Sequence, residues 1–320
     1  MELKLLKSVT PSVSTPVSSP NTLFVTRVWS NSNFRFARSR SPRKLILSVQ
    51  ASASSNTRLE NKNRVDESES FTLDGIRSSL MRQEDSIIFS LLERAQYCYN
   101  ANTYDQNAFS KKGFQGSLVE FMVRETEQLH ALVGRYQSPD EHPFYPADLP
   151  KPMLPPLKYP QVLQPIADSI NINKKIWDMY FNDLLPRLVN KGDDGNCGSS
   201  AVCDTGCLQL LSKRIHYGKF VAEAKFQAAS IVYEDAIRAQ DRDQLLALLT
   251  YETVEAVVKD RVEMKARIYG QEIRVNGKIR VNVDDQLYKI EPSIVADLYG
   301  DWIMPLTKEV QVEYLLRRLD

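Results

Sequence analysis

The chain has 320 residues, with 41 Lys and Arg against 40 Asp and Glu, 42% hydrophobic residues and four cysteines. The charges are unevenly placed: residues 1–59 carry nine basic residues and one acid, a local charge of +8, so residues 60–320 carry −7. A negatively charged body argues against a general nucleic-acid binder, because such proteins normally present a basic surface.

Residues 1–59 have the composition of an organelle-targeting leader. They contain thirteen serines and a basic cluster made of Arg35, Arg38, Arg40, Arg43 and Lys44. No apolar run in them approaches the ~20 residues needed to span a bilayer, and the compact apolar core of a secretory signal is missing. Dense Ser, Thr and Pro favour a plastid over a mitochondrial address. We predict a transit peptide over residues 1–59, a disordered linker over residues 60–68 and no membrane segment, with a disordered cytosolic tail as the alternative.

The body, residues 69–320, is long enough for one sizeable core, and its pattern is helical. A first helix is introduced by residues 71–74, after which apolar residues recur at helical spacing at Ile76, Leu80, Ile87, Leu91 and Ala95. Further helices are expected near 115–135, 172–190, 204–239, 242–248, 250–269 and 293–319. Pro305 should bend the last helix or stand where it begins. The predicted fold class is all-α, with a single multi-helix domain.

Three segments are predicted to be irregular. Residues 138–165 hold nine of the sixteen prolines, so we expect a Pro-rich strap laid over the helices and anchored by its apolar side chains. Residues 192–200 are polar and Gly-rich, which predicts a loop. Residues 272–283 could form a hairpin around Asn276-Gly277, but its register would place apolar residues opposite basic ones. A flexible loop over 271–290, before the C-terminal helix, is therefore expected.

The cysteines and the known catalytic motifs give no sign of a cofactor. Cys197, Cys203 and Cys207 are spaced C-x5-C-x3-C with no nearby His, which is poor zinc spacing. No Gly-rich phosphate loop, paired metal ligands or nucleophile elbow is present. We predict no metal and no cofactor, and ordinary reduced thiols, with a redox role for the loop between Cys197 and Cys207 left open.

The most informative segment is 211–226, LSKRIHYGKFVAEAKF. Read as one helix, it places Arg214, Gly218, Val221 and Lys225 on a single stripe, with the two cations about 16 Å apart along the axis. Gly in a helix interior costs roughly 1 kcal/mol relative to Ala, so its presence calls for a reason. We expect Gly218 to be the floor of a site for a small anion gripped by the two cations. The alternative is a solvated basic face.

Three segments also carry a family resemblance: IRSSLMRQEDSIIFSLLERAQY at 76–97, KRIHYGKFVAEAKF at 213–226 and PLTKEVQVEYLLRRLD at 305–320. Together they resemble the eukaryotic all-helical chorismate mutases, and the leader is similar to that of the plastidial plant form. The resemblance implies conversion of chorismate to prephenate on the route to phenylalanine and tyrosine, in a homodimer of the chloroplast stroma. A non-catalytic helical plastid protein, acting as an amino-acid sensor or partner, is the alternative.

The resemblance also implies a set of site residues. The reaction is an intramolecular [3,3] rearrangement of a dianion, which needs a charged cage and no reagent. In the implied cage, Arg77 and Arg214 hold the carboxylates, and Thr307 is a further carboxylate ligand. Lys225 and Gln311 donate to the ether oxygen. Glu255 accepts from the ring hydroxyl. Fungal relatives carry Glu where this chain has Gln311. An amide donates at any pH, so we expect a pH–rate profile that is flat through neutrality.

Regulation is implied in the same way. Family members with an effector site bind amino acids between subunits, at positions that correspond here to Gly134 and Arg135 and to Asn196, Gly198 and Ser199. Arg135 would hold the effector carboxylate and the loop would meet its amino group. The resemblance implies feedback inhibition by Phe and Tyr and activation by Trp. The alternative is that both segments are simple turns, with Gly134 as a helix C-cap.

Overall fold

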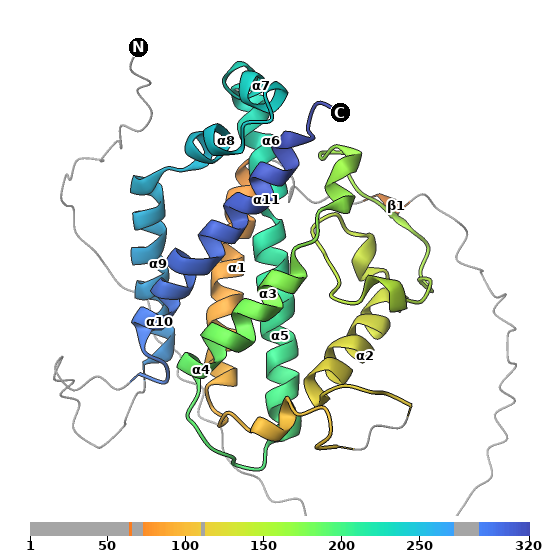
Figure 1. The fold of residues 1–320 in the computed structure, drawn as a ribbon, viewed down its shortest axis with the longest axis vertical. Helices are drawn as coiled ribbons and strands as arrows, with labels where there is room; N and C mark the ends of the chain where they lie inside the picture. Colours follow the sequence, from red (N-terminus) through yellow and green to blue (C-terminus); the bar gives the residue numbers. More distant parts are fainter. Residues whose placement is uncertain (1–63, 66–72, 110–112, 272–287) are drawn as a thin grey trace, which may run out of the picture. The chain divides into compact units, whose positions relative to one another are not determined.

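Helices α5 (Cys197–His216) and α6 (Gly218–Ala228) run end to end through the middle of the fold, and the other helices pack around them (Figure 1). The computed structural model describes residues 64–65, 73–109, 113–271 and 288–320, which all belong to one compact unit. α1 (Leu73–Arg94) and α2 (Leu118–Leu132) lie along α5, while α11 (Met304–Leu316) packs on both α5 and α6. The predicted all-α fold class is confirmed.

The remaining helices complete a bundle around this axis. They are α3 (Asn173–Met179), α4 (Leu185–Leu188), α7 (Ser230–Arg238), α8 (Arg242–Leu249), α9 (Glu252–Gly270) and α10 (Pro292–Asp297). The π-helical turn Tyr180–Leu184 joins α3 to α4, and a second one, Leu298–Ile303, joins α10 to α11. Pro305 lies in the first turn of α11, directly after the second π-helical turn, as the sequence predicted. The wider turn accommodates a residue that has no N–H to donate.

The prediction of one helix over residues 204–239 is wrong at its start and in its middle, while its end agrees with the end of α7 at Arg238. The helix begins earlier, at Cys197, so the polar loop before it is shorter than predicted. Ala229 has φ −155° and ψ 56°, which ends α6 before α7 begins. Tyr217, between α5 and α6, keeps right-handed helical angles, φ −60° and ψ −13°. Because the helical path continues through Tyr217, side chains on either side of it can still share one face.

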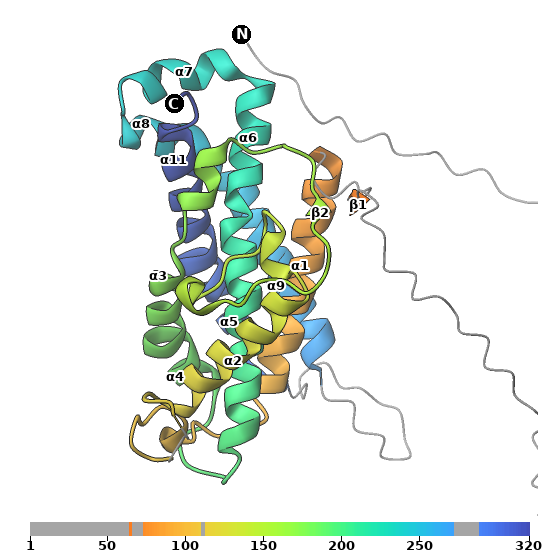
Figure 2. The same ribbon diagram turned by 90° about the vertical axis from the view of Figure 1, so that its right-hand side faces the viewer.

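The Pro-rich strap is ordered and hydrogen-bonded to the helices beneath it (Figure 2). It contains a short 3₁₀ turn at Pro146–Asp148, and two others flank it, Arg135–Gln137 before it and Pro165–Ser169 at its end. The buried carboxylate of Glu127 on α2 accepts from the backbone N–H groups of Phe144 and Tyr145 at 2.7 and 2.9 Å. Burial raises the pKa of Glu127 to about 7. The two hydrogen bonds oppose this shift, because they favour the charged form of the carboxylate. The sequence prediction of an ordered strap is confirmed.

A short parallel ladder was not predicted. β1 (Arg64–Val65), inside the segment predicted to be a disordered linker, pairs with β2 (Leu157–Lys158) of the strap. The predicted flexible loop and the alternative hairpin fall mostly on residues 272–287, outside the described part of the chain. At its borders, Gln271 and Tyr288 form an antiparallel bridge, and the N–H of Lys289 donates to the Gly270 carbonyl at 2.8 Å. The predicted leader likewise lies outside the described residues.

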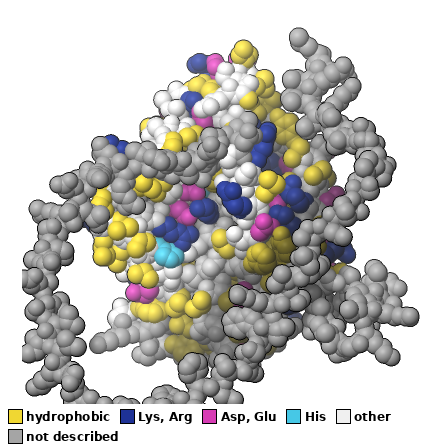
Figure 3. Space-filling model, turned by 180° about the vertical axis from the view of Figure 1, so that it is seen from behind, with side chains coloured by type: hydrophobic (Ala, Val, Ile, Leu, Met, Phe, Trp, Pro, Cys, Tyr) yellow, Lys and Arg dark blue, Asp and Glu magenta, His cyan; other side chains and the backbone are white. Residues whose placement is uncertain are grey.

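On the face seen from behind, basic and acidic side chains lie beside one another, with hydrophobic side chains between them (Figure 3). Among the described helices, none is long and apolar enough to cross a membrane.

Gly218 serves helix packing and is not the floor of a ligand site, so that prediction is wrong. A Cβ built on it would lie 2.7 Å from the Thr307 carbonyl oxygen and 3.0 Å from Thr307 Cγ2. The missing side chain therefore lets α11 approach the start of α6 closely. This contact brings the residues of α11 next to the stripe on α5 and α6.

We expect Gly218→Ala to lower the free energy of unfolding by about 1–3 kcal/mol, because the new Cβ overpacks the contact with the α11 backbone. The matched control is Gly206→Ala, within α5, where a Cβ would meet Ser90 Oγ at an ordinary 3.6 Å. Since Ala is the better helix former, this control should be neutral or stabilising. Urea unfolding of both variants measures the difference, and equal stabilities would contradict the packing role.

Candidate active site

A cavity of about 140 Å³ lies where α11 faces the stripe on α5 and α6. It is lined by Leu80 of α1, Arg214 of α5, Val221 and Lys225 of α6, Leu249, Tyr251, the α9 residues Val254, Glu255 and Val258, and the α11 residues Met304, Thr307, Lys308 and Gln311. Arg214, Val221 and Lys225 thus share one cavity, as the stripe predicted. Gly218 does not line it.

Arg214 is a buried cation that lacks an ion-pair partner in the described part of the chain. It is 7% exposed, and its NH1 approaches Thr307 Oγ1 at 3.5 Å. The guanidinium carbon lies 5.9 Å from the centre of the Tyr299 ring, and its Nε–H has no hydrogen-bond partner. Buried donors of this kind are nearly always satisfied in folded proteins. An anionic ligand in the cavity would supply what Arg214 lacks.

Lys225 points its ammonium into the same cavity. Its Nζ donates to the Leu249 carbonyl at 3.1 Å and to Gln311 Oε1 at 3.4 Å, and lies 4.8 Å from the centre of the Tyr251 ring. Burial lowers the pKa of Lys225 to about 8; nearby Glu255 opposes this shift and Lys308 adds to it. The ammonium is therefore charged at neutral pH but incompletely compensated.

Thr307 and Gln311 are buried on the inner face of α11, one turn apart. The Thr307 hydroxyl donates to the Ile303 carbonyl, which leaves its oxygen turned to Arg214. Gln311 is 4% exposed; its Nε2 donates to the Thr307 carbonyl at 3.3 Å while its Oε1 accepts from Lys225. An amide nitrogen carries two hydrogens, so one remains for a ligand. This burial shows that Gln311 is not a surface residue of α11.

Glu255, at the start of α9, forms an ion pair with Lys308 of α11 at 2.9 and 3.1 Å. Lys308 lines the cavity but was missed from the sequence. The available signal was its position three residues before Gln311, which puts both on one helix face. With Arg214, Lys225 and Lys308 against Glu255, the cavity carries an excess of two positive charges. That excess suits a ligand with two negative charges.

Arg77 is the one predicted catalytic residue that does not line the cavity. Its side chain is exposed on α1, one turn before Leu80, which does line the cavity. Arg77 has interactions of its own in this structure. Its implied role as a carboxylate clamp therefore remains a prediction.

Arg135 is held within its own subunit. Its Nε donates to Glu141 Oε2 at 2.9 Å, and its NH1 lies 2.8 Å from both His130 Nδ1 and Gln209 Oε1. Gly134 has φ +84° and its N–H bonds the Ala131 carbonyl, so it closes α2 as the alternative reading proposed. A C-cap role does not conflict with a neighbouring ligand site.

Asn196, Gly198 and Ser199 lie at the start of α5, away from Arg135. Gln209, which Arg135 contacts, follows Asn196 by thirteen residues on that helix, or about 20 Å. One chain therefore does not bring the two groups of predicted effector residues together. An amino acid could touch both groups where a second chain supplies one of them.

The histidines lie outside the active-site cavity. His216 is fully buried and accepts from the Ile172 N–H at 2.9 Å, which is a packing role. His130 and His142 also have partners within the chain. His130 contacts Arg135, and His142 stacks on His216 and contacts the Lys219 ammonium. The partners of His142 are more than 70 residues away in the sequence, so spacing gave no signal for them.

Fold and site together define a class: an all-α protein with a cationic internal cavity for a small dianion. In the described part of the chain, no group of His, Cys, Asp and Glu could hold a metal ion. The family model of chorismate mutase type II matches residues 197–312, which include the candidate residues of α5, α6, α9 and α11.

Relatives and solved structures agree with this family model. "Chorismate mutase 1, chloroplastic" of Petunia hybrida is 64% identical over 327 residues and covers 100% of both chains. The crystal structures of AtCM1 with phenylalanine or tyrosine bound in the allosteric site each have a TM-score of 0.74 and 71% identity, over 80% of this chain and 100% of that chain. The crystal structure of the Candida albicans chorismate mutase Aro7p in complex with L-Trp has a TM-score of 0.71 and 38% identity. The match covers 78% of this chain and 92% of that chain.

The chain belongs to the chorismate mutase family. It is an isomerase, and the relatives named chloroplastic agree with the plastid address predicted from the leader.

The pKa of Lys225 predicts a specific pH dependence. We expect kcat/KM for chorismate to be flat through neutrality and to fall above about pH 8, where the free enzyme loses the Lys225 proton. The bound dianion should keep the ammonium charged, so kcat should stay flat over the same range. Steady-state rates at a series of pH values test this. A steep fall in kcat between about pH 6 and 8 would contradict it.

Gln311→Glu is the matched variant for this pH profile. A carboxyl group must be protonated to donate, so we expect kcat of this variant to fall as pH rises, which the wild type should not show. At the alkaline end the loss should approach that of one electrostatic donor, about 10²–10³-fold.

Proposed function

We propose that this chain, as a homodimer in the chloroplast stroma, converts chorismate to prephenate through the cavity between α6, α9 and α11. The observation that carries the proposal is the convergence of Arg214, Lys225 and Gln311 on one cavity whose net charge is the opposite of the substrate's. Chorismate carries two carboxylates, one ether oxygen and one ring hydroxyl. Each of these groups has a complementary side chain in or beside the cavity.

The chemistry needs no bond between protein and substrate. The ether C–O bond breaks while a C–C bond forms within the same molecule, and electrons shift around a six-membered array. The protein accelerates this by holding the compact conformer and by stabilising negative charge on the ether oxygen as it departs. Donors that are fixed in a desolvated cavity are effective for this purpose, because they need no reorganisation when the charge develops.

Each residue then has a defined role. Arg214, with its unsatisfied Nε–H and its neighbour Thr307, binds one carboxylate in a two-pronged contact. Lys225 and Gln311, whose side chains meet at 3.4 Å, direct their remaining N–H groups to the ether oxygen. Glu255, held by Lys308, accepts from the ring hydroxyl. Arg77, one turn from the cavity wall, binds the second carboxylate from outside.

The magnitudes are sufficient. A modest enzyme lowers its barrier by roughly 8 kcal/mol. One well-placed donor supplies on the order of 3 kcal/mol, and two donors with a fixed conformer reach the required total.

We expect Lys225→Met to lower kcat about 10²–10³-fold, because it removes a donor whose target charge grows in the transition state. Arg214→Met should raise KM more than it lowers kcat, because it removes carboxylate binding common to ground and transition states. The rate of chorismate loss is the measurement. The control variant is Lys174→Met, which removes one positive charge from an exposed position on α3. Equal activity of wild type and Lys225→Met would contradict the role assigned to Lys225.

We further propose that phenylalanine and tyrosine inhibit the enzyme and that tryptophan activates it. The likeness to AtCM1 structures with phenylalanine and tyrosine in an allosteric site, and to Aro7p with L-Trp, supports this class of effector. The separation of about 20 Å along α5 between the two residue groups supports a site made by two chains. Arg135 of one protomer would bind the effector carboxylate, after exchange from Glu141. The start of α5 in the other protomer would meet the amino group.

Complementation between two variants tests this arrangement. Arg135→Ala removes one half of the site, and Gly198→Leu fills the other half, since a Cβ at Gly198 meets nothing within 4 Å in its own described chain. Each homodimer should keep its basal activity and lose its response to the amino acids. A heterodimer of the two variants retains one intact site, so about half of the response should return. No recovery in the heterodimer would contradict a site shared between chains.

A further inference from the structure

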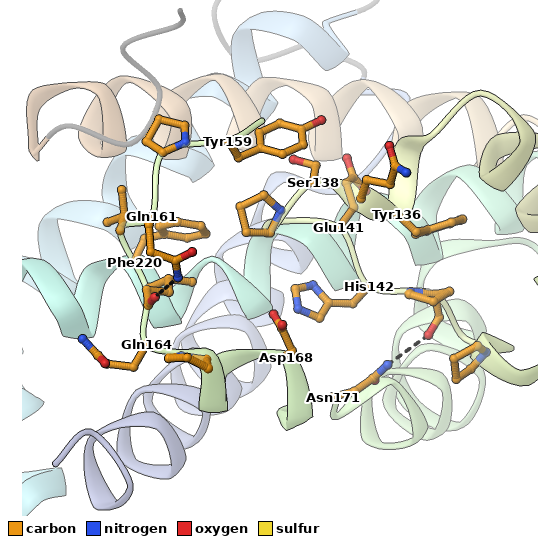
Figure 4. A pocket seen from close by; sticks show the side chains of 18 residues that line it. Tyr136, Ser138, Glu141, His142, Tyr159, Gln161, Gln164, Asp168, Asn171 and Phe220 are labelled. Carbon is orange, nitrogen blue, oxygen red and sulfur yellow. Dashed lines mark hydrogen bonds between the residues drawn. The ribbon is translucent and has the colours of Figure 1, made fainter. Parts of the chain in front are cut away.

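A second cavity, of about 550 Å³, lies beneath the Pro-rich strap, and its size is within the range of small-molecule sites. Its walls come from the strap, from the 3₁₀ turn Pro165–Ser169 and from α6 (Figure 4). Eight of its eighteen lining residues are proline, tyrosine or phenylalanine, and eight others are polar or charged. The residues that matter here are Glu141, His142, Tyr159, Gln164, Asp168 and Phe220.

The charge of this cavity is opposite to that of the active site. Its described lining contains two carboxylates, from Glu141 and Asp168, and no Lys or Arg. The active-site cavity is lined by Arg214, Lys225 and Lys308 against a single carboxylate. The side chains that line the strap cavity therefore do not favour a dianion such as chorismate or prephenate, and a carboxylate without an ion-pair partner among them would attract a cation.

The two carboxylates differ in what they already bind. Glu141 is neutralised by Lys213 at 2.7 Å and by Arg135 at 2.9 Å. Asp168 has neither an ion pair nor a side-chain hydrogen bond with any described residue. The nearby ammonium of Lys219 is buried and donates to the Ala167 carbonyl at 2.9 Å while contacting His142. Asp168 is therefore the acceptor that remains for a ligand, and Figure 4 shows it directed toward the middle of the cavity.

Aromatic faces accompany this carboxylate. Tyr159 lines the cavity from the strap, and Phe220 lines it from α6. An ammonium group is attracted both to a carboxylate and to the face of an aromatic ring, and an aromatic ligand packs well against proline and phenylalanine. Amide groups such as that of Gln164 add neutral hydrogen-bond partners.

We propose that the strap cavity binds a small organic ammonium compound carrying an aromatic group, with Asp168 as its counter-ion. The site is separate from both sites described above, because neither Arg135 nor Asn196 nor any residue of the active-site cavity lines it. It does not depend on the proposed catalytic roles.

Calorimetric titration of the full chain with 2-phenylethylamine tests the proposal, with its neutral isostere 2-phenylethanol as the comparison. The amine should bind saturably and at least tenfold more tightly than the alcohol. Asp168→Asn, which keeps the shape and removes the charge, should weaken amine binding at least fivefold. Asp178→Asn, which removes the charge of an exposed carboxylate on α3, should leave amine binding unchanged. Arg135→Ala should not weaken amine binding, because it removes a cation that neutralises Glu141 in the cavity wall.

The mutase activity of Asp168→Asn should equal that of the wild type. A failure of the amine-binding proposal is therefore distinguishable from a failure of the catalytic proposal. No saturable binding of the amine, equal binding of the alcohol, or full binding by Asp168→Asn would each overturn the proposal. Loss of amine binding in Arg135→Ala would also overturn it, because the ligand would then occupy the effector site.

Discussion

The close approach of α11 to the junction of α5 and α6 is the constraint on which the rest of the site depends. At Gly218 the backbones of α6 and α11 come so near that a single methyl group would strike the Thr307 carbonyl. This nearness places Thr307 opposite Arg214 and Gln311 opposite Lys225. The functional groups are thus fixed by backbone packing, which is stiffer than any arrangement that long side chains achieve alone.

The cavity also keeps its cations in an unfavourable state. Arg214 is buried with no ion-paired carboxylate among the described residues, and burial lowers the pKa of Lys225. Folding bears this desolvation cost in advance, and a ligand with two negative charges relieves it on binding. Electrostatic preorganisation and reduced stability of the empty protein are therefore two aspects of one arrangement. The apolar core around α5 offsets the cost, since Leu208, Leu211 and Ile215 are fully buried.

The helices and the faces that their side chains share could be predicted largely from local periodicity in the sequence. The stripe of Arg214, Val221 and Lys225 survives because Tyr217 keeps helical angles between α5 and α6. The reason for Gly218 was misjudged, because its neighbour Thr307 is 89 positions away and no local pattern shows such contacts. Lys308 was missed for a similar reason: its partner Glu255 lies on another helix. The family resemblance, rather than periodicity, supplied Glu255, Thr307 and Gln311.

The pairing of β1 with β2 extends the folded body upstream of α1. Arg64 and Val65 stand beside Leu157 and Lys158 in a parallel ladder, so they belong to the folded enzyme although composition assigns them to a linker. A truncation that removed Val65 would strip this edge from the strap that roofs the second cavity. A shortened chain that is meant to keep the strap intact therefore has to begin upstream of Arg64.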